Sequence, residues 1–147
     1  MITTQSFKKT KPLIFLSILL PSIFWSYQFI NGSLGVNPIE KYMDNMGEMA
    51  LRLIVLTLFV SSLSEFKKFR FLIDVRRMIG LFAFFYVSCH FLTYITLDHF
   101  FDMNFIIKDI IKRPFITFGF ISFIFLILVL LLYRLYFKII LPQLARL

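Results

Sequence analysis

Long apolar runs alternate with short polar segments along the chain. Four such runs cover residues 13–30, about 49–63, 78–97 and 115–132. Because a helix needs about 20 mostly apolar residues to cross the hydrocarbon core of a bilayer, each run predicts a membrane-spanning helix. The second run is the weakest, since Arg52 interrupts it, although an arginine near the end of a span can extend its side chain to the interface.

The polar segment before the last run has a helical pattern of its own. Between Asp98 and Pro114, apolar residues recur at helical spacing with charged residues between them. This pattern predicts a short amphipathic helix in the plane of the membrane interface; a plain connector between two spans is the alternative. The apolar positions are Met103, Ile106, Ile107, Ile110 and Ile111.

The first apolar run resembles a secretory signal peptide, because it follows Lys8, Lys9 and Lys11. However, the run is long, it contains Pro21 and Trp25, and no small-x-small cleavage pattern follows closely. We therefore expect a retained membrane helix.

Composition also indicates a membrane protein. Hydrophobic residues make up 59% of the chain and charged residues only 16%, and the mean hydropathy is +0.84, whereas about 25% of the residues in a soluble domain are charged. The predicted fold class is all-α: an integral membrane helical bundle of about four transmembrane helices, forming a single membrane domain over residues 1–147.

The charged residues indicate how the chain crosses the bilayer. If the four runs are spans, one side of the membrane holds eleven bases and two acids, for a net charge of +9, and the other holds five bases and six acids, for a net charge of −1. Basic residues concentrate on the cytoplasmic side, so both termini are predicted to be cytoplasmic. The overall charge of +8 then reflects the orientation of the chain in the lipid bilayer, and no binding of nucleic acid is needed to explain it.

A histidine lies inside the third apolar run. A titratable or metal-binding side chain within a span is a candidate functional group, and at about 100° per residue Gly80, Ala83, Val87, His90 and Tyr94 share one helix face. The small residues beside the imidazole predict a shallow groove, which suits either close helix packing or a flat macrocycle whose iron the imidazole binds. A neutral imidazole hydrogen-bonded to a backbone carbonyl or a nearby hydroxyl is the structural alternative.

Three segments resemble one known family in order and spacing: NPIEKYMDNMGEMALRLIVLTLFVSSL, RRMIGLFAFFYVSCHFLTYITLD and KDIIKRPFITFGFISF. The most specific features are the arginine pair followed by Met-Ile-Gly-Leu, with His90 ten residues after that glycine, and the Lys-Arg-Pro-Phe-Ile-Thr motif that opens the last span. Over residues 37–125 the chain is similar to the membrane heme-binding subunit of the bacterial periplasmic methionine sulfoxide reductase system, a member of the ferric reductase-like transmembrane group.

The resemblance implies a heme b-binding cytochrome of the bacterial inner membrane, which in some members also holds flavin mononucleotide. Such a subunit takes electrons from quinone or a cytoplasmic flavin reductase and passes them to a soluble molybdenum-containing partner in the periplasm, which repairs oxidised methionines. His90 lies where the family places its first heme ligand, with Gly80, Ala83 and Val87 as cofactor-binding neighbours. The chemistry of sulfoxide reduction would belong to the partner.

Two arginines are candidates for contact with the heme propionates. Arg76 lies on the His90 face, but fourteen residues, about 21 Å of helix, separate the two. Arg52, near the outer end of the second span, is the competing candidate. The alternative is that both arginines anchor their helices at the membrane interface.

The last part of the chain departs from the family pattern. We expect the family region to cover about residues 45–133 and residues 126–147 to differ from it, because the family continues into two further helices with additional heme-binding histidines. The chain is therefore expected to be truncated. His99 lies about 180° from His90 on a continuous helix and is not expected to share its iron. The alternative function is a truncated, non-catalytic membrane protein with only a helix-packing or partner-interaction role.

Overall fold

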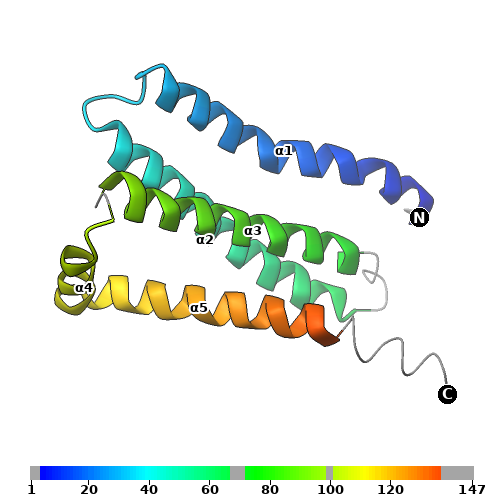
Figure 1. The fold of residues 1–147 in the computed structure, drawn as a ribbon. Coiled ribbons are helices and arrows are strands. Elements are labelled where there is room, and N and C mark those ends of the chain that lie inside the picture. Colours follow the sequence, from blue (N-terminus) through cyan, green and yellow to red (C-terminus); the bar gives the residue numbers. More distant parts are fainter. Residues whose placement is uncertain (1–3, 67–71, 99–100, 137–147) are drawn as a thin grey trace. The chain divides into compact units, whose positions relative to one another are not determined.

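The computed structural model describes residues 4–66, 72–98 and 101–136, and every regular element in these ranges is helical (Figure 1). The predicted all-α membrane fold is confirmed. The elements are α1 (Thr4–Ile30), α2 (Pro38–Ser64), α3 (Ile73–Thr93), the π-helical segment η2 (Tyr94–Asp98), α4 (Met103–Lys112) and α5 (Pro114–Leu135).

Three helical stretches are long and apolar enough to cross a membrane: Thr10–Ile30, Pro38–Ser64 and Val75–Asp98. A fourth is added if the bent pair Ile106–Lys112 and Ile116–Leu132 counts as one span. The described residues thus contain three or four candidate spans, which agrees with the prediction of about four. The chain is a multi-pass membrane protein.

α2 begins earlier than the apolar run predicted. The sequence indicated a span from about residue 49, with Glu40 and Asp44 in an outer loop, but the helix starts at Pro38. Proline is favoured at the first helical position, because the N–H that it lacks would have no partner within the helix. The Asn37 amide also donates to the Glu40 carboxylate at 2.8 Å. The first turns of α2 are helical and polar, so a hydropathy pattern detects only the apolar remainder.

A glycine ends α1. Gly32 has a φ of 65°, a left-handed conformation that glycine adopts without steric cost. The N–H of Ser33 donates to the Gln28 carbonyl at 3.0 Å, and the N–H of Gly32 donates to the Phe29 carbonyl at 3.2 Å, which is the Schellman pattern of a helix C-terminus. The chain then reverses, so that α1 and α2 run antiparallel (Figure 1).

The chain divides into two compact units, Met1–Phe100 and Phe101–Leu147. In the first unit, the successive helices α1, α2 and α3 run in alternating directions (Figure 1), and α2 and α3 make the most extensive helix contact. The prediction of a single membrane domain stays a prediction. The buried core of the first unit comes mostly from α2 and α3: Ile18, Met46, Ala50, Leu53, Val60, Val75, Ile79, Phe82, Ala83 and Tyr86.

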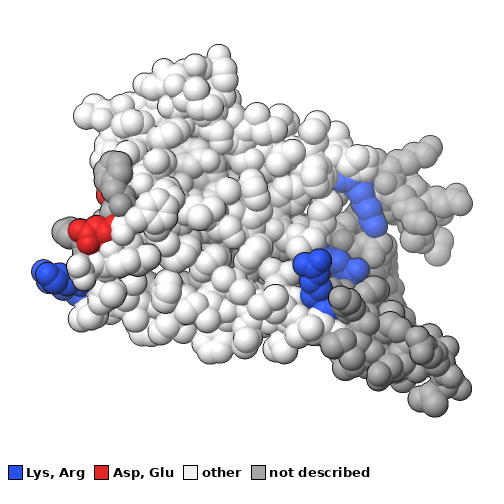
Figure 2. All heavy atoms as spheres, viewed as in Figure 1, with Lys and Arg blue, Asp and Glu red and all other residues white. Residues whose placement is uncertain are grey.

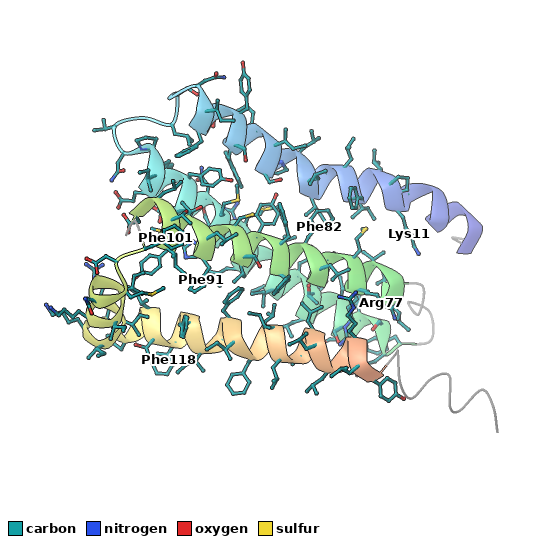
Figure 3. All side chains as sticks on the ribbon, viewed as in Figure 1. Lys11, Arg77, Phe82, Phe91, Phe101 and Phe118 are labelled. Atoms are coloured by element: carbon teal, nitrogen blue, oxygen red, sulfur yellow. The ribbon has the colours of Figure 1, made fainter. Side chains whose placement is uncertain are left out.

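Two contacts attach the middle of α1 to α3. The hydroxyl of Tyr86, a fully buried residue of α3, donates to the Ile18 carbonyl on α1 at 2.6 Å. The rings of Phe82 and Phe15 meet edge to face, with centroids 4.9 Å apart, and Figure 3 shows Phe82 directed from α3 towards α1. One polar bond and one aromatic pair therefore fix α1 against α3.

In the second unit, α4 and α5 meet at a sharp bend. The two helices are inclined by 110°, and α5 begins at Pro114. The Thr117 hydroxyl in the first turns of α5 donates to the carbonyl of Ile110 in α4 at 2.6 Å. This bond supplies a donor to one of the carbonyls that the end of α4 leaves without an intrahelical partner.

α4 confirms the predicted short amphipathic helix. Ile106 is buried, whereas Ile107 and Ile111 remain exposed. Exposed isoleucines on a helix beside a span suit contact with the bilayer surface. That placement in the interface plane stays a prediction.

Several charged side chains of the first unit lie near the ends of its helices, whereas Glu48 and Arg52 form an ion pair further along α2. Lys11 and Arg77 lie at the end opposite the loop between α1 and α2 (Figure 3), while Glu40 lies in the first turn of α2, next to that loop. On the face drawn in Figure 2, the middle stretches of the helices carry no charged side chain. Lys11 and Arg77 thus lie at the helix ends that the predicted orientation places in the cytoplasm; the cytoplasmic position of the termini stays a prediction.

Candidate functional site

His90 is half-buried in the last turn of α3 and faces α2. Its Nδ1 lies 2.8 Å from the carbonyl oxygen of Met43 in α2. A carbonyl only accepts hydrogen bonds, so we assign the proton to Nδ1. In a neutral imidazole, the lone pair is then on Nε2. Within the part of the chain that the structure describes, no hydrogen-bond partner is found for Nε2.

Gly47 makes this hydrogen bond possible. A Cβ atom at this position would lie 2.9 Å from Nδ1 of His90, a distance that real Cβ atoms essentially never show, and 3.1 Å from Cε1, which is tighter than most Cβ contacts. In a helix the Cα–Cβ bond tilts towards the N-terminus, so a side chain at 47 would lie over the turn that contains Met43. The absence of that side chain opens the space in which the imidazole reaches the Met43 carbonyl.

The predicted groove on α3 lies against α2. A Cβ on Gly80 would be 3.8 Å from Cγ2 of Thr57, and Ala83 is buried. Val87 packs against the same core, while Tyr94 begins η2 and is half-buried. The small residues on this face therefore serve close packing of α2 on α3. Their predicted role in seating a heme stays a prediction.

The two candidate arginines lie on the surface of the first unit. Arg52 is in the middle of α2 rather than near its outer end, its side chain is 64% exposed, and its Nη2 is 2.5 Å from the Glu48 carboxylate. Arg76 is exposed in the first turn of α3. Within the described residues, no hydrogen bond or ion pair joins either arginine to His90. Their contact with heme propionates stays a prediction, and His99 lies outside the described residues.

The donor set fits a prosthetic-group iron better than an all-protein metal site. Among residues 4–66, 72–98 and 101–136, no three His, Cys, Asp or Glu side chains gather to hold a metal ion. A heme supplies four nitrogen ligands itself and needs only axial donors from the protein. A single imidazole with a fixed Nδ1 proton and an unpaired Nε2 matches that requirement, because metal-binding histidines usually donate their other N–H to a carbonyl or carboxylate.

Sequence reasoning identified His90 but missed Met43 and Gly47. A glycine inside a helical pattern is a weak sign of close approach by another group, and Gly47 falls in the polar start of α2, before the apolar run that predicts the second span. The partner of Gly47 lies on another helix, so no local pattern could name it. The predicted alternative of an imidazole bonded to a backbone carbonyl is what the structure contains, but the carbonyl comes from the neighbouring helix.

The fold and the site define a multi-pass helical membrane protein whose third helix directs an imidazole at the second. The sequence matches the family described as "Ferric reductase like transmembrane component" over residues 46–140, which extends into the segment 126–147. The chain belongs to this family, and the predicted resemblance is confirmed. No solved structure matches the chain significantly.

Several curated relatives carry the name protein-methionine-sulfoxide reductase heme-binding subunit MsrQ. The relative from Herminiimonas arsenicoxydans is 44% identical over 80% of this chain and 54% of its own length. The Caulobacter vibrioides relative is 42% identical over 78% of the chain and 55% of its own length, and the Azospira oryzae relative is 41% identical over 85% and 54%. The chain thus spans about half the length of these relatives.

Proposed function

We propose that the chain is a heme b-binding electron-transfer subunit in which Nε2 of His90 is an axial ligand of the iron. The observation that carries this proposal is the hydrogen bond between Nδ1 of His90 and the Met43 carbonyl, which leaves the Nε2 lone pair available. Membership of the ferric reductase-like family and the heme-binding names of the relatives support the same cofactor.

The residues around His90 would hold and orient the imidazole. Gly80 and Ala83 let α2 approach α3 closely, and Val87 packs one turn before the histidine, so that the ring is held between two helices. Arg52 and Arg76 are proposed as partners of the heme propionates. A bound heme would supply a one-electron iron couple, and the family resemblance supports flavin mononucleotide as a second cofactor.

The partners follow from the same family membership. Quinone or a cytoplasmic flavin reductase would supply the electrons, and a periplasmic molybdenum-containing methionine sulfoxide reductase would receive them. This arrangement requires a location in the bacterial inner membrane, where a multi-pass protein contacts quinone in the bilayer and soluble partners on both sides. Sulfoxide reduction would take place on the periplasmic partner.

The proposal is tested by heme retention in two variants that treat the two imidazole nitrogens differently. His90→Asn places an amide N–H close to the position of Nδ1, so the bond to Met43 is kept while the Nε2 donor is removed. We expect the purified variant to insert and fold but to lose the Soret and alpha bands per mole of protein. His99→Ala, the matched control at the only other histidine, should keep the wild-type spectrum.

A non-catalytic packing role is the second candidate function. The observation that favours it is the close contact of the Gly80 and Ala83 face with α2, which needs no cofactor. In that case wild-type membranes would contain no heme bound to this chain. Equal band intensities for His90→Asn and His99→Ala would likewise exclude His90 as the ligand.

A further inference from the structure

Three described glycines lie inside helices, and they differ in what a side chain would meet. A Cβ on Gly119 in α5 would have no atom within 4 Å, and a Cβ on Gly80 in α3 would make an ordinary contact at 3.8 Å. A Cβ on Gly47 in α2 would meet the ring of His90 at 2.9 Å. Of the three, only Gly47 occupies a position where an added Cβ would come closer than 3.0 Å to a described atom.

The imidazole lies against the turn of α2 that contains Met43. A carbonyl oxygen has two lone pairs, so the Met43 carbonyl can accept a bond within α2 and a second bond from Nδ1 of His90 at 2.8 Å. The ring atoms nearest to Gly47 are Nδ1 and Cε1, which belong to the edge of the ring that makes this bond. A side chain at position 47 would therefore displace the bonded edge.

We propose that Gly47 is a positioning residue: its bare backbone lets the His90 ring bond to the Met43 carbonyl, which keeps the proton on Nδ1 and the lone pair on Nε2. The consequence for heme rests on the proposed function, whereas the position of the proton does not. The geometry thus assigns a role to a glycine 43 residues before the histidine in the sequence, on a different helix.

The proton position is measured first, in protein without heme. Side-chain 15N NMR of protein labelled at histidine distinguishes the two neutral tautomers, and the chain has only two histidines, so His99→Ala assigns the signals. Wild type should show His90 as one tautomer with the proton on Nδ1. Gly47→Ala should give a mixture of tautomers, while the control Gly119→Ala, where an added Cβ meets no described atom within 4 Å, should keep the wild-type signal. A wild-type signal in Gly47→Ala would overturn the proposal.

Heme binding is measured next, on the full chain. Outer partners of metal-bound histidines typically contribute about 10- to 100-fold to affinity, so Gly47→Ala should weaken heme binding by that factor, while the control Gly119→Ala leaves it unchanged. Loss of the bond to Met43 also makes the imidazole a poorer electron donor, so the midpoint potential of the variant should rise. Unchanged affinity and potential in Gly47→Ala would overturn the positioning role.

A double-variant cycle covers the case in which Gly47→Ala folds poorly. If the cause is contact with the ring, the loss of stability caused by Gly47→Ala in wild type should disappear in a His90→Ala background. An equal loss in both backgrounds would contradict the proposal. Failure of the positioning role can be distinguished from failure of the proposed function. If the chain binds no heme, but His90 carries its proton on Nδ1 and the double-variant cycle shows coupling, the heme proposal is wrong and the positioning role of Gly47 stands.

Discussion

The hydrogen bond between α1 and α3 makes a measurable contribution to stability. Tyr86→Phe removes only the hydroxyl that donates to the Ile18 carbonyl at 2.6 Å, at a residue with 0% exposure. The phenyl ring keeps its packing, so no cavity opens, and the loss is that of the polar contacts of the hydroxyl with α1, namely the bond to Ile18 and the interaction with Ser22. The variant therefore isolates the polar link that fixes α1.

The loss of stability in Tyr86→Phe depends on the burial of the hydrogen bond and on the membrane environment around it. A hydrogen bond within a protein contributes about 0.5–1.5 kcal/mol net, and bonds between membrane helices average about 0.6 kcal/mol with a maximum of about 1.7. The Tyr86 bond is short and fully buried, and its loss leaves a carbonyl with one acceptor site unused. We expect Tyr86→Phe to lower the free energy of unfolding by about 1–1.7 kcal/mol.

Unfolding in mixed micelles by titration with a denaturing detergent, followed by circular dichroism, measures this difference. The matched control is Tyr27→Phe, which removes the same hydroxyl from a side chain that is 66% exposed on α1. The control should change stability by less than about 0.5 kcal/mol, as is usual for surface substitutions. Equal effects of the two substitutions would refute the claim that the buried bond holds α1 against α3.

Two further predictions use the glycines and the loops. Gly119→Ala places a Cβ in open space on α5, so it should raise the free energy of unfolding by about 0.5–1 kcal/mol through helix propensity, measured in the same assay; no gain would contradict the open surroundings of Gly119. A reporter active only in the cytoplasm should work when inserted near Lys68 and fail near Gly35, in the loop between α1 and α2, because bases concentrate on the cytoplasmic side; equal activity at both sites would contradict the predicted orientation.

The helices were predictable because their signals are local. The apolar runs located the cores of α1, α3 and α5, and the spacing of the isoleucines located α4. The start of α2 was missed because its first turns carry Glu40, Lys41 and Asp44, and a hydropathy pattern cannot distinguish a polar helix start from a loop.

The site was predictable only in part, because it depends on contacts between helices. His90 was a candidate because it is a polar residue inside an apolar run. The Met43 carbonyl is a backbone group with no sequence signature, and Gly47 is recognisable only once α2 lies against α3. The small size of Gly80 and Ala83 indicated close approach of another group. Small residues alone do not distinguish a neighbouring helix from a macrocycle.

The central claim is that Nε2 of His90 binds heme iron while the Nδ1–H group donates a hydrogen bond to the Met43 carbonyl. Pulsed electron paramagnetic resonance on the heme-loaded, oxidised protein, labelled with 15N at histidine, detects the ligand directly through its coupling to the iron. We predict a strongly coupled 15N that is kept in His99→Ala and lost in His90→Asn. A coupled 15N that persists in His90→Asn, or none in the wild type, would contradict the assignment of His90 as the ligand.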